Sequence, residues 1–202
     1  MRDCFLVVIF SVLYYRLPTI ECLHVAAGPP LLNSPVYSLA TKRTSDDGGR
    51  TNMNLVTYAS PMSIRPDRLW AIGLYKETQS YEIFKETRQG VLQLLTQDHI
   101  PIVRLLGGAS GRDVDKQMEC SKLGFEWKML REDNQQYPLA LSGCKSYLCL
   151  ELEGESLIDG GSHGIAICRV TDMFSDSEDE AHLETRLLRE LGIITAQGRI
   201  AD

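Results

Sequence analysis

Apolar and polar positions in the first half of the chain alternate or cluster in the manner of β-strands. Val36–Thr41 and Asn52–Ala59 are short runs with β-branched and aromatic residues, and the polar, glycine-rich segment Lys42–Arg50 lies between them. Two strand patterns separated by such a segment predict a hairpin with a long loop. Leu69–Tyr75 is a nearly continuous apolar run, which is typical of a strand covered on both faces.

Helical spacing is found between the strand patterns that follow. Ser80 is expected to cap a short helix that ends at Gly90, and the apolar run that starts at Gly90 predicts another strand. Asp98–Gly108 carries apolar residues at three-residue spacing, which indicates a helix. Ser110–Gly124 begins with a capping-box pattern and predicts one more helix.

The second half of the chain adds further strands and a last helix. Phe125–Met129 alternates, and Cys144–Glu153 and Gly164–Thr171 predict two longer strands joined by an Asp-Gly-Gly turn. After an acidic run at Asp176–Glu180, the leucines of Leu183–Leu191 recur at helical spacing. Strands and helices do not alternate strictly, so the pattern predicts a mainly β fold with α insertions, either an antiparallel barrel or a sandwich.

The N-terminus carries an apolar run, Cys4–Tyr15, that is shorter than the roughly 20 residues a membrane-spanning helix needs. Its length matches the core of a signal peptide, whereas Asp3 is untypical of one. Two interpretations stay open. Residues 1–27 are either a secretory signal, or an organelle-targeting or atypical segment of an intracellular protein of the plastid or cytoplasm.

Composition changes at two places and suggests three parts. A proline pair at Pro29 and Pro30 enters the folded region, and an acidic stretch follows Phe174. We therefore expect an N-terminal segment at residues 1–28, a folded domain at 29–174, and an acidic hinge with a C-terminal amphipathic helix at 175–202.

Charge and cysteine spacing exclude several classes of function. The formal net charge is -6, whereas a general nucleic-acid binder needs a basic face. The six cysteines show neither zinc spacing nor a Cys/His cluster, so we expect buried free thiols and no metal site. Nucleotide-loop, zinc-protease and hydrolase signatures are absent from the sequence, and no catalytic constellation is expected.

The second predicted strand carries polar groups on both of its faces. Asn52 and Asn54 lie among hydrophobic residues, and a buried amide without partners costs about 1–3 kcal/mol. These side chains therefore either bond to neighbouring loops or face a polar ligand.

Four segments in order resemble the flavin reductase-like family, the FMN-binding split β-barrel proteins related to pyridoxine-phosphate oxidase, and the likeness is greatest to plant members. The first is TNMNLVTYASPMSIRPDRLWAIGL, which resembles the family's Asn-x-Met-Thr strand and its Ser-Pro-x-Ser turn. KETQSYEIFKETRQGVLQLL resembles its phosphate-side loop, helix and strand. SGRDVDK and GSHGIAICRV resemble its Ser-Gly-x-x-x-Asp-Lys and Gly-Asp-His segments, so the likeness covers about two-thirds of the chain.

The resemblance implies a split barrel that binds FMN and takes a hydride from NAD(P)H. It implies contacts to the isoalloxazine ring and ribityl chain from Asn52, Met53, Asn54, Thr57, Tyr58, Ala59 and Ser60. It also implies a phosphate site at Lys76, Thr78 and Ser80, although Thr78 stands at the family's usual basic position, and a contact to flavin or nicotinamide from His163. A homodimer is implied as well.

Alternatives remain at several of these positions. Met53 could serve core packing, Ser80 could be an ordinary helix cap, and the charged residues Arg112–Lys116 could form a solvated face rather than close the pocket. At the level of function, the alternatives to a reductase are a carrier or sensor of FMN without turnover, and a ligand-free interaction domain.

Overall fold

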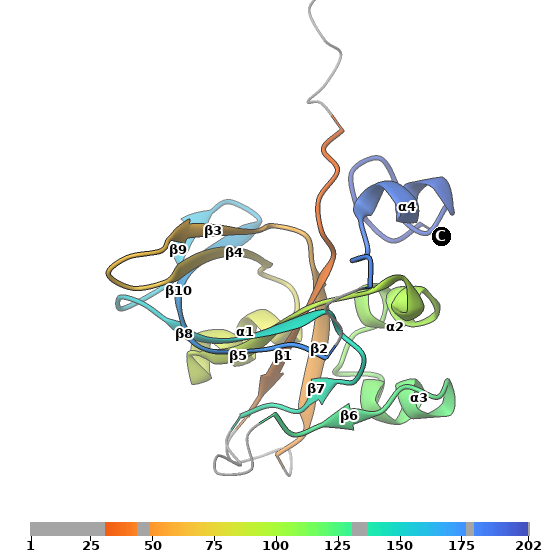
Figure 1. The fold of residues 1–202 in the computed structure, drawn as a ribbon, viewed down its shortest axis with the longest axis horizontal. Coiled ribbons are helices and arrows are strands. Elements are labelled where there is room, and N and C mark those ends of the chain that lie inside the picture. Colours follow the sequence, from red (N-terminus) through yellow and green to blue (C-terminus); the bar gives the residue numbers. More distant parts are fainter. Residues whose placement is uncertain (1–30, 44–48, 131–136, 177–179, 202) are drawn as a thin grey trace, which may run out of the picture. The chain divides into compact units, whose positions relative to one another are not determined.

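A computed structural model describes residues 31–43, 49–130, 137–176 and 180–201 (Figure 1). The predicted segment 1–28 and most of the acidic run Asp176–Glu180 lie outside these residues. The elements are β1 (Tyr37–Lys42), β2 (Thr51–Val56), β3 (Ala59–Ser63), β4 (Leu69–Tyr75), α1 (Gln79–Thr87), β5 (Gln89–Leu94), the 3-10 helix η1 (Gln97–Ile102), α2 (Val103–Gly108), α3 (Lys116–Lys122), β6 (Trp127–Lys128), β7 (Ala140–Leu141), β8 (Ser146–Leu152), β9 (Ile158–Gly160), β10 (His163–Phe174) and α4 (Thr185–Glu190).

The described strands, apart from the short pair β6–β7, form one antiparallel sheet in the order β2-β1-β5-β8-β10-β4-β3, with β9 added on β10. The two ends of this path, β2 and β3, are consecutive in the chain and are separated only by Thr57 and Tyr58. The sheet must therefore curl until its ends approach each other, which produces the half-barrel seen in Figure 1. The predicted mainly β fold with α insertions is confirmed.

Two apolar cores lie on the two faces of the curled sheet. Alternation along each strand sends successive side chains to opposite faces, so Leu39 of β1 joins one core and Ala40 joins the other. The inner core gathers residues of the strands around Phe84 of α1. The outer core lies between the sheet and η1, α2 and α3, and Leu183 and Leu188 complete it near the C-terminus. Both faces of the central strands are thereby buried.

Several sequence-based boundaries are confirmed and others need correction. β4 has the predicted bounds, and the hairpin of β1 and β2 is formed. The second strand was expected to run on to Ala59, but it stops at Val56 because the sheet turns its corner at the next two residues. Between Phe125 and Met129 only the two residues of β6 pair with β7.

Two helix starts differ from the prediction because other side chains provide the caps. Thr78, not Ser80, caps α1, and its hydroxyl accepts a hydrogen bond from the Tyr81 N–H at 3.2 Å. Asp115 caps α3 through the Met118 N–H at 3.1 Å, so the predicted capping box at Ser110 is wrong.

The ends of α1 and α4 also differ in detail from the pattern. Arg88, in the left-handed region at φ 62, ends α1 two residues before Gly90. In the C-terminal leucine stripe, Leu183 precedes α4 and pairs with the sheet, since its N–H donates to the Leu95 carbonyl at 2.7 Å. Leu188 is buried, whereas Leu191 is exposed. β10 ends at Phe174, where the sequence predicts the end of the folded domain, but Leu183 and Leu188 beyond it still pack in the outer core.

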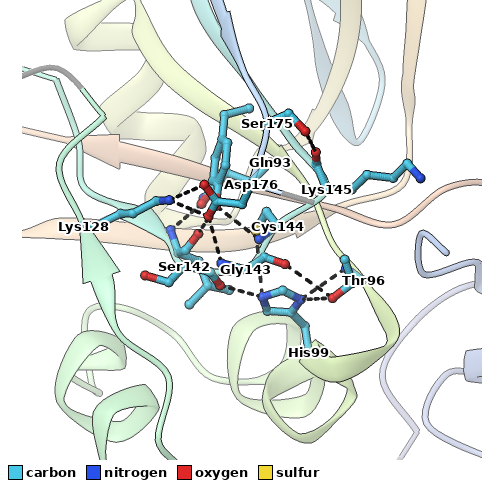
Figure 2. A network of polar contacts seen from close by, with 12 residues as sticks. Gln93, Thr96, His99, Lys128, Ser142, Gly143, Cys144, Lys145, Ser175 and Asp176 are labelled. Atoms are coloured by element: carbon cyan, nitrogen blue, oxygen red, sulfur yellow. Dashed lines mark hydrogen bonds and ion pairs between the residues drawn. The ribbon is translucent and has the colours of Figure 1, made fainter. Parts of the chain in front are cut away.

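A polar network fastens the segment after β10 to the start of β8 (Figure 2). The carboxylate of Asp176 accepts hydrogen bonds from the hydroxyl of Tyr147 at 2.6 Å and from the Gly143 N–H at 3.1 Å, and it pairs with Lys128. Burial alone would raise the pKa of Asp176, but these donors hold it below its usual value. The network therefore requires an ionised carboxylate.

None of the helices in the part of the chain that the structure describes has the length and apolar character needed to span a bilayer.

Replacing Tyr147 by Phe should destabilise the protein by about 1–3 kcal/mol. The hydroxyl of Tyr147 is buried and also accepts from the Cys144 N–H at 3.1 Å, so its loss leaves that N–H and Asp176 without this partner. Urea unfolding measures the effect. Tyr81→Phe is the control, because the Tyr81 hydroxyl makes no hydrogen bond to the described residues, and equal stability of the two variants would contradict the role given to the network.

Candidate functional site

A hollow of about 480 Å³ lies over the β3–β4 hairpin of the described structure. A volume of this size is within the range of small-molecule sites, which measure about 300–1,000 Å³. Its walls are mostly small or apolar residues, namely Thr57, Tyr58, Ala59, Ser60, Ala71, Ile72, Gly73, Gly160, His163 and Ile165. We call it the first hollow.

Small residues on β4 make the floor of the first hollow flat. An ideal Cβ on Gly73 would lie 3.1 Å from the Cβ of Tyr58, and the Gly73 N–H donates to the Tyr58 carbonyl at 2.8 Å. Ala71, which lines the hollow, is only half-buried. The expectation that β4 is covered on both faces is therefore wrong at the hollow.

Three rings stand at one end of the first hollow. The imidazole of His163 lies 5.4 Å from the ring of Tyr58 and 5.4 Å from the ring of Tyr75, measured between centroids. Burial, followed by the positive charge of Arg199, lowers the pKa of His163, so the imidazole is neutral at neutral pH. It can donate or accept a hydrogen bond but brings no charge.

A second, polar hollow of about 210 Å³ adjoins this cluster of rings, since Tyr75 lines it and contacts His163. Its walls come from β2, the start of α1 and the loop after α2, and they comprise Asn52, Asn54, Tyr75, Glu77, Thr78, Gln79, Ser80, Gly107, Gly108, Ala109, Ser110, Gly111 and Lys116. The N-terminus of α1 contributes free N–H groups and the positive end of the helix dipole to this hollow.

Lys116 brings a buried positive charge to the wall of the second hollow. Its side chain is only 4% exposed, and its ammonium donates to the carbonyls of Met53 and Leu106 at 2.8 Å each. No carboxylate of the described residues pairs with it. Burial lowers the pKa of Lys116 to about 8, so it stays mostly charged at pH 7. An ammonium has three N–H groups, and the two carbonyls leave one for a ligand.

Two amide oxygens in the same wall have no hydrogen-bond donor within the described structure. They are Oδ1 of Asn52 and Oε1 of Gln79, both buried, whereas the amide nitrogen of Asn52 donates to the Ser80 hydroxyl at 2.8 Å. The backbone of Gly111 covers both oxygens, since an ideal Cβ there would lie 2.1 Å from the first and 2.3 Å from the second. Buried polar atoms without partners are rare and mark places where a ligand or water completes the bonding.

Nine of the eleven residues predicted from the sequence line one of the two hollows. Those in the first hollow are Thr57, Tyr58, Ala59, Ser60 and His163, and those in the second are Asn52, Asn54, Thr78 and Ser80. The structure therefore places the predicted ring contacts in two neighbouring spaces rather than along one continuous strand.

Met53 and Lys76 line neither hollow. The side chain of Met53 is fully buried in the outer core, and only its carbonyl reaches the site, through Lys116. The ammonium of Lys76 pairs with the Asp159 carboxylate at 2.8 Å. Neither side chain contacts the space that the other predicted residues surround.

Lys116 and Gly111 line the second hollow but are not among the predicted site residues, although closing the pocket was one of the two interpretations of the segment Arg112–Lys116. The run Arg112–Lys116 has the composition of a solvated charged face, and Arg112 and Asp113 are indeed on the surface, whereas Lys116 is buried. The sequence signal for Lys116 was the resemblance of SGRDVDK to a family segment. The burial of Lys116 itself could not be predicted, because it depends on contacts with residues far away in the sequence.

A second cluster with reactive residue types lies outside both hollows and is excluded as a nucleophilic site. Cys144 Sγ lies 3.9 Å from Nε2 of His99, which donates to the Ser142 carbonyl at 3.0 Å (Figure 2). Burial raises the pKa of the Cys144 thiol far above its usual value and lowers the pKa of His99. The thiol stays protonated and closed off from solvent, so this pair is structural.

Comparison with known proteins gives one family and a group of similar folds. The flavin reductase like domain matches residues 31–190. No curated protein sequence matches the chain. Flavoredoxin from Methanosarcina acetivorans superposes with a TM-score of 0.62 at 14% identity, covering 81% of this chain and 91% of its own.

Two further solved structures have the same fold. The NADH:FAD oxidoreductase of Streptomyces globisporus gives a TM-score of 0.61 at 14% identity and covers 76% of this chain and 81% of its own. The FMN-binding protein from Thermus thermophilus gives 0.60 at 17% identity, with 78% and 83% covered. At such low identity these likenesses establish the fold only.

The buried ammonium predicts a specific pH dependence of stability. In the unfolded chain Lys116 has its usual pKa of 10.5, whereas in the folded protein the pKa is about 8. Between these values the unfolded state binds more protons, so the free energy of unfolding of the wild type should rise with pH relative to that of Lys116→Met, by at most about 1.4 kcal/mol per pH unit.

Urea unfolding of both proteins from pH 7 to above pH 10 measures this difference. Lys122→Met is the matched control on the same helix, because its side chain is 58% exposed and its difference from the wild type should stay constant. A constant difference for Lys116→Met as well would mean that its ammonium is solvated in the folded protein.

Proposed function

The chain belongs to the flavin reductase-like family, and on this premise we propose that it binds FMN across the two hollows and acts as an NAD(P)H-dependent flavin reductase. The observation that carries the proposal is the second hollow. It combines a buried ammonium that has no carboxylate partner among the described residues with two amide oxygens that have no donor. The fold of the FMN-binding and flavin-reducing proteins compared above supports it.

The first hollow suits the isoalloxazine ring. The ring is flat and largely apolar, and it requires a slot with small side chains, backbone polar groups and few charges. The floor formed by Ala71 and Gly73 has these properties, and no charged side chain lines this hollow. Thr57 and Ser60 supply hydroxyls, and the neutral His163 supplies a ring nitrogen at the end nearest the second hollow.

The second hollow suits the ribityl phosphate. Ribityl hydroxyls are donors of the kind that the amide oxygens of Asn52 and Gln79 lack, once the backbone at Gly111 moves aside. The phosphate can be held by the third N–H of Lys116, the Ser80 hydroxyl and the N–H groups at the start of α1. Lys116 thus takes the role that the sequence suggested for Lys76.

The protein's own part in the reaction is to bind, orient and exclude water. Bound FMN would supply the hydride acceptor at its N5 atom. The wall of Ala59, Ala71 and Gly73 fixes the plane of the flavin ring. Tyr58 is 61% exposed, so the hollow is open to solvent beside it and a nicotinamide has room to reach the flavin ring there. No side chain of the two hollows needs to exchange a proton, which agrees with the lack of a charged group in the first hollow.

We also propose that two copies of the chain associate through the end of the sheet at β3. Among the described strands, β3 pairs with β4 alone, so its other edge has no strand partner there. Met62 is 62% exposed and Ile64 is 76% exposed on or beside this strand, and Ile158 of β9 is 58% exposed. Exposed apolar groups on an open edge are typical of an interface, and a second copy seated there would help to cover the first hollow.

FMN should bind the purified protein and give it a yellow colour. Asn52→Asp combined with Ser80→Glu should weaken FMN binding by about a hundredfold or more, because it places like charge against the phosphate. Ser121→Glu with Lys122→Gln is the control, since it changes the net charge equally at the far end of α3. Titration of flavin fluorescence gives the affinities, and circular dichroism checks the fold. Unaltered affinity in the first variant would rule out the second hollow.

Turnover separates the reductase from the alternatives. The FMN-loaded protein should consume NADH or NADPH steadily in the presence of excess flavin. Flavin binding without consumption would instead indicate a carrier or sensor, and absence of binding would indicate a ligand-free interaction domain.

The proposed dimer predicts a molar mass of two chains by light scattering after gel filtration. Met62→Lys with Ile64→Lys should reduce it to one chain. Met118→Lys is the control, because Met118 is 51% exposed on α3, away from β3. A wild-type protein that is monomeric, or a double variant that stays dimeric, would contradict the proposed interface.

A further inference from the structure

The segment after α4 is held firmly against α2, although it follows the region that the family match covers. Arg104 of α2 donates to the Gly192 carbonyl at 2.9 Å and also to the Ala201 carbonyl, and the Ala201 N–H donates to the Ile193 carbonyl at 2.9 Å. The segment therefore has a defined position relative to the site rather than lying free on the surface.

This segment packs on the wall of the second hollow. The side chain of Ile200 would lie 3.1 Å from an ideal Cβ on Gly107 and 3.5 Å from one on Gly108, and both glycines line that hollow. A tight turn precedes it, in which the Thr195 N–H donates to the Arg199 carbonyl at 2.7 Å. Arg199 is next to Ile200 in sequence, so its backbone is held beside the Gly107–Gly108 wall of the second hollow.

The guanidinium of Arg199 is exposed and makes no hydrogen bond or ion pair within the described part of the chain. Its positive charge nevertheless acts on two rings, that of His163 in the first hollow and that of Tyr75 in the second. Arg199 helps to lower the pKa of His163, and it opposes the rise that Glu77 causes in the pKa of Tyr75. Both effects agree with the position of the Arg199 backbone beside the Gly107–Gly108 wall.

We propose that Arg199 binds a phosphate group of the nucleotide that occupies the site. The inference rests on the proposed function and adds a residue to it. A guanidinium presents several N–H groups in a planar fork that matches phosphate oxygens. Since the chain carries a formal net charge of -6, a phosphate needs local positive charge to approach. Lys116 supplies it in the wall of the second hollow, and Arg199 would add to it from the segment that packs on that wall.

The phosphate has two possible sources, the flavin itself or an incoming nicotinamide dinucleotide. Both present the same chemistry to a guanidinium, and FMN has a counterpart that keeps the ring without the phosphate, namely riboflavin. Comparing FMN with riboflavin therefore isolates the first source, and titrating NADPH and NADH onto the FMN-loaded protein isolates the second.

The test uses the full chain with Arg199→Gln, the conservative Arg199→Lys, and Arg186→Gln as the control. Arg186 lies on the exposed side of α4 and pairs only weakly with Glu190 at 3.9 Å. Losing a charged hydrogen bond should weaken phosphate binding about tenfold to a hundredfold in Arg199→Gln, with partial recovery in Arg199→Lys and no change in Arg186→Gln.

The outcomes separate the sources and also the two proposals. Weaker binding of FMN with unchanged binding of riboflavin assigns Arg199 to the flavin phosphate, whereas unchanged FMN with weaker NADPH or NADH assigns it to the nicotinamide nucleotide. If Arg199→Gln binds all four ligands like the wild type, the role of Arg199 is refuted while FMN binding stands. If the wild type binds neither flavin, the proposed function fails, and the role of Arg199 fails with it.

Discussion

The short connection between β2 and β3 determines where both hollows lie. The two strands stand at opposite ends of the sheet path, yet only Thr57 and Tyr58 join them. Three Cα–Cα steps join Val56 to Ala59 and span at most about 11 Å, so the sheet has to curl until the end of β2 and the start of β3 lie close together. Before the corner β2 turns its asparagines to the second hollow, and after it β3 lines the first. The polar groups of this stretch are thus distributed over two spaces by the curl of the sheet.

The second hollow departs from the rules that the rest of the fold obeys. Strand alternation, helix caps and the two cores are consistent with one another, whereas the wall of this hollow holds a buried cation and two amide oxygens without partners. Each such group costs folding free energy of about 1–3 kcal/mol or more. Local violations of this kind are expected where a protein gives up stability for function. A ligand with hydroxyls and an anionic end would offset the cost of all three groups together.

Strand positions could be predicted because they depend on local alternation. β4 has the predicted bounds, and the pairing of β1 with β2 follows from the polar loop between them. Helix starts were harder, because Thr78 and Ser80 offer equivalent hydroxyls and only the backbone decides which one caps α1. The hydroxyl of Ser80 in α1 instead accepts a hydrogen bond from the amide of Asn52 in β2.

Within the site, the polar and small residues predicted from the sequence line one of the two hollows, whereas the side chain of the predicted Lys76 lines neither. Lys76 and Lys116 are the same residue type but have different partners. Lys76 pairs with the carboxylate of Asp159 in β9. The ammonium of Lys116 donates instead to the carbonyls of Met53 and Leu106. Those partners come together only in the folded chain.

The arrangement also separates charge from the place where a ring can bind. In the described residues, all the charged wall groups belong to the second hollow, the first has none, and the neutral His163 stands near the boundary between them. An apolar slot with an uncharged imidazole favours a neutral, flat group, and charge-assisted contacts on the other side of His163 fix its tail. Because the two spaces adjoin at a single cluster of rings, a ligand that fills both can lie in only one direction. The direction of the ligand then follows from electrostatics, and the floor of the first hollow need only fix the plane of the ligand's ring.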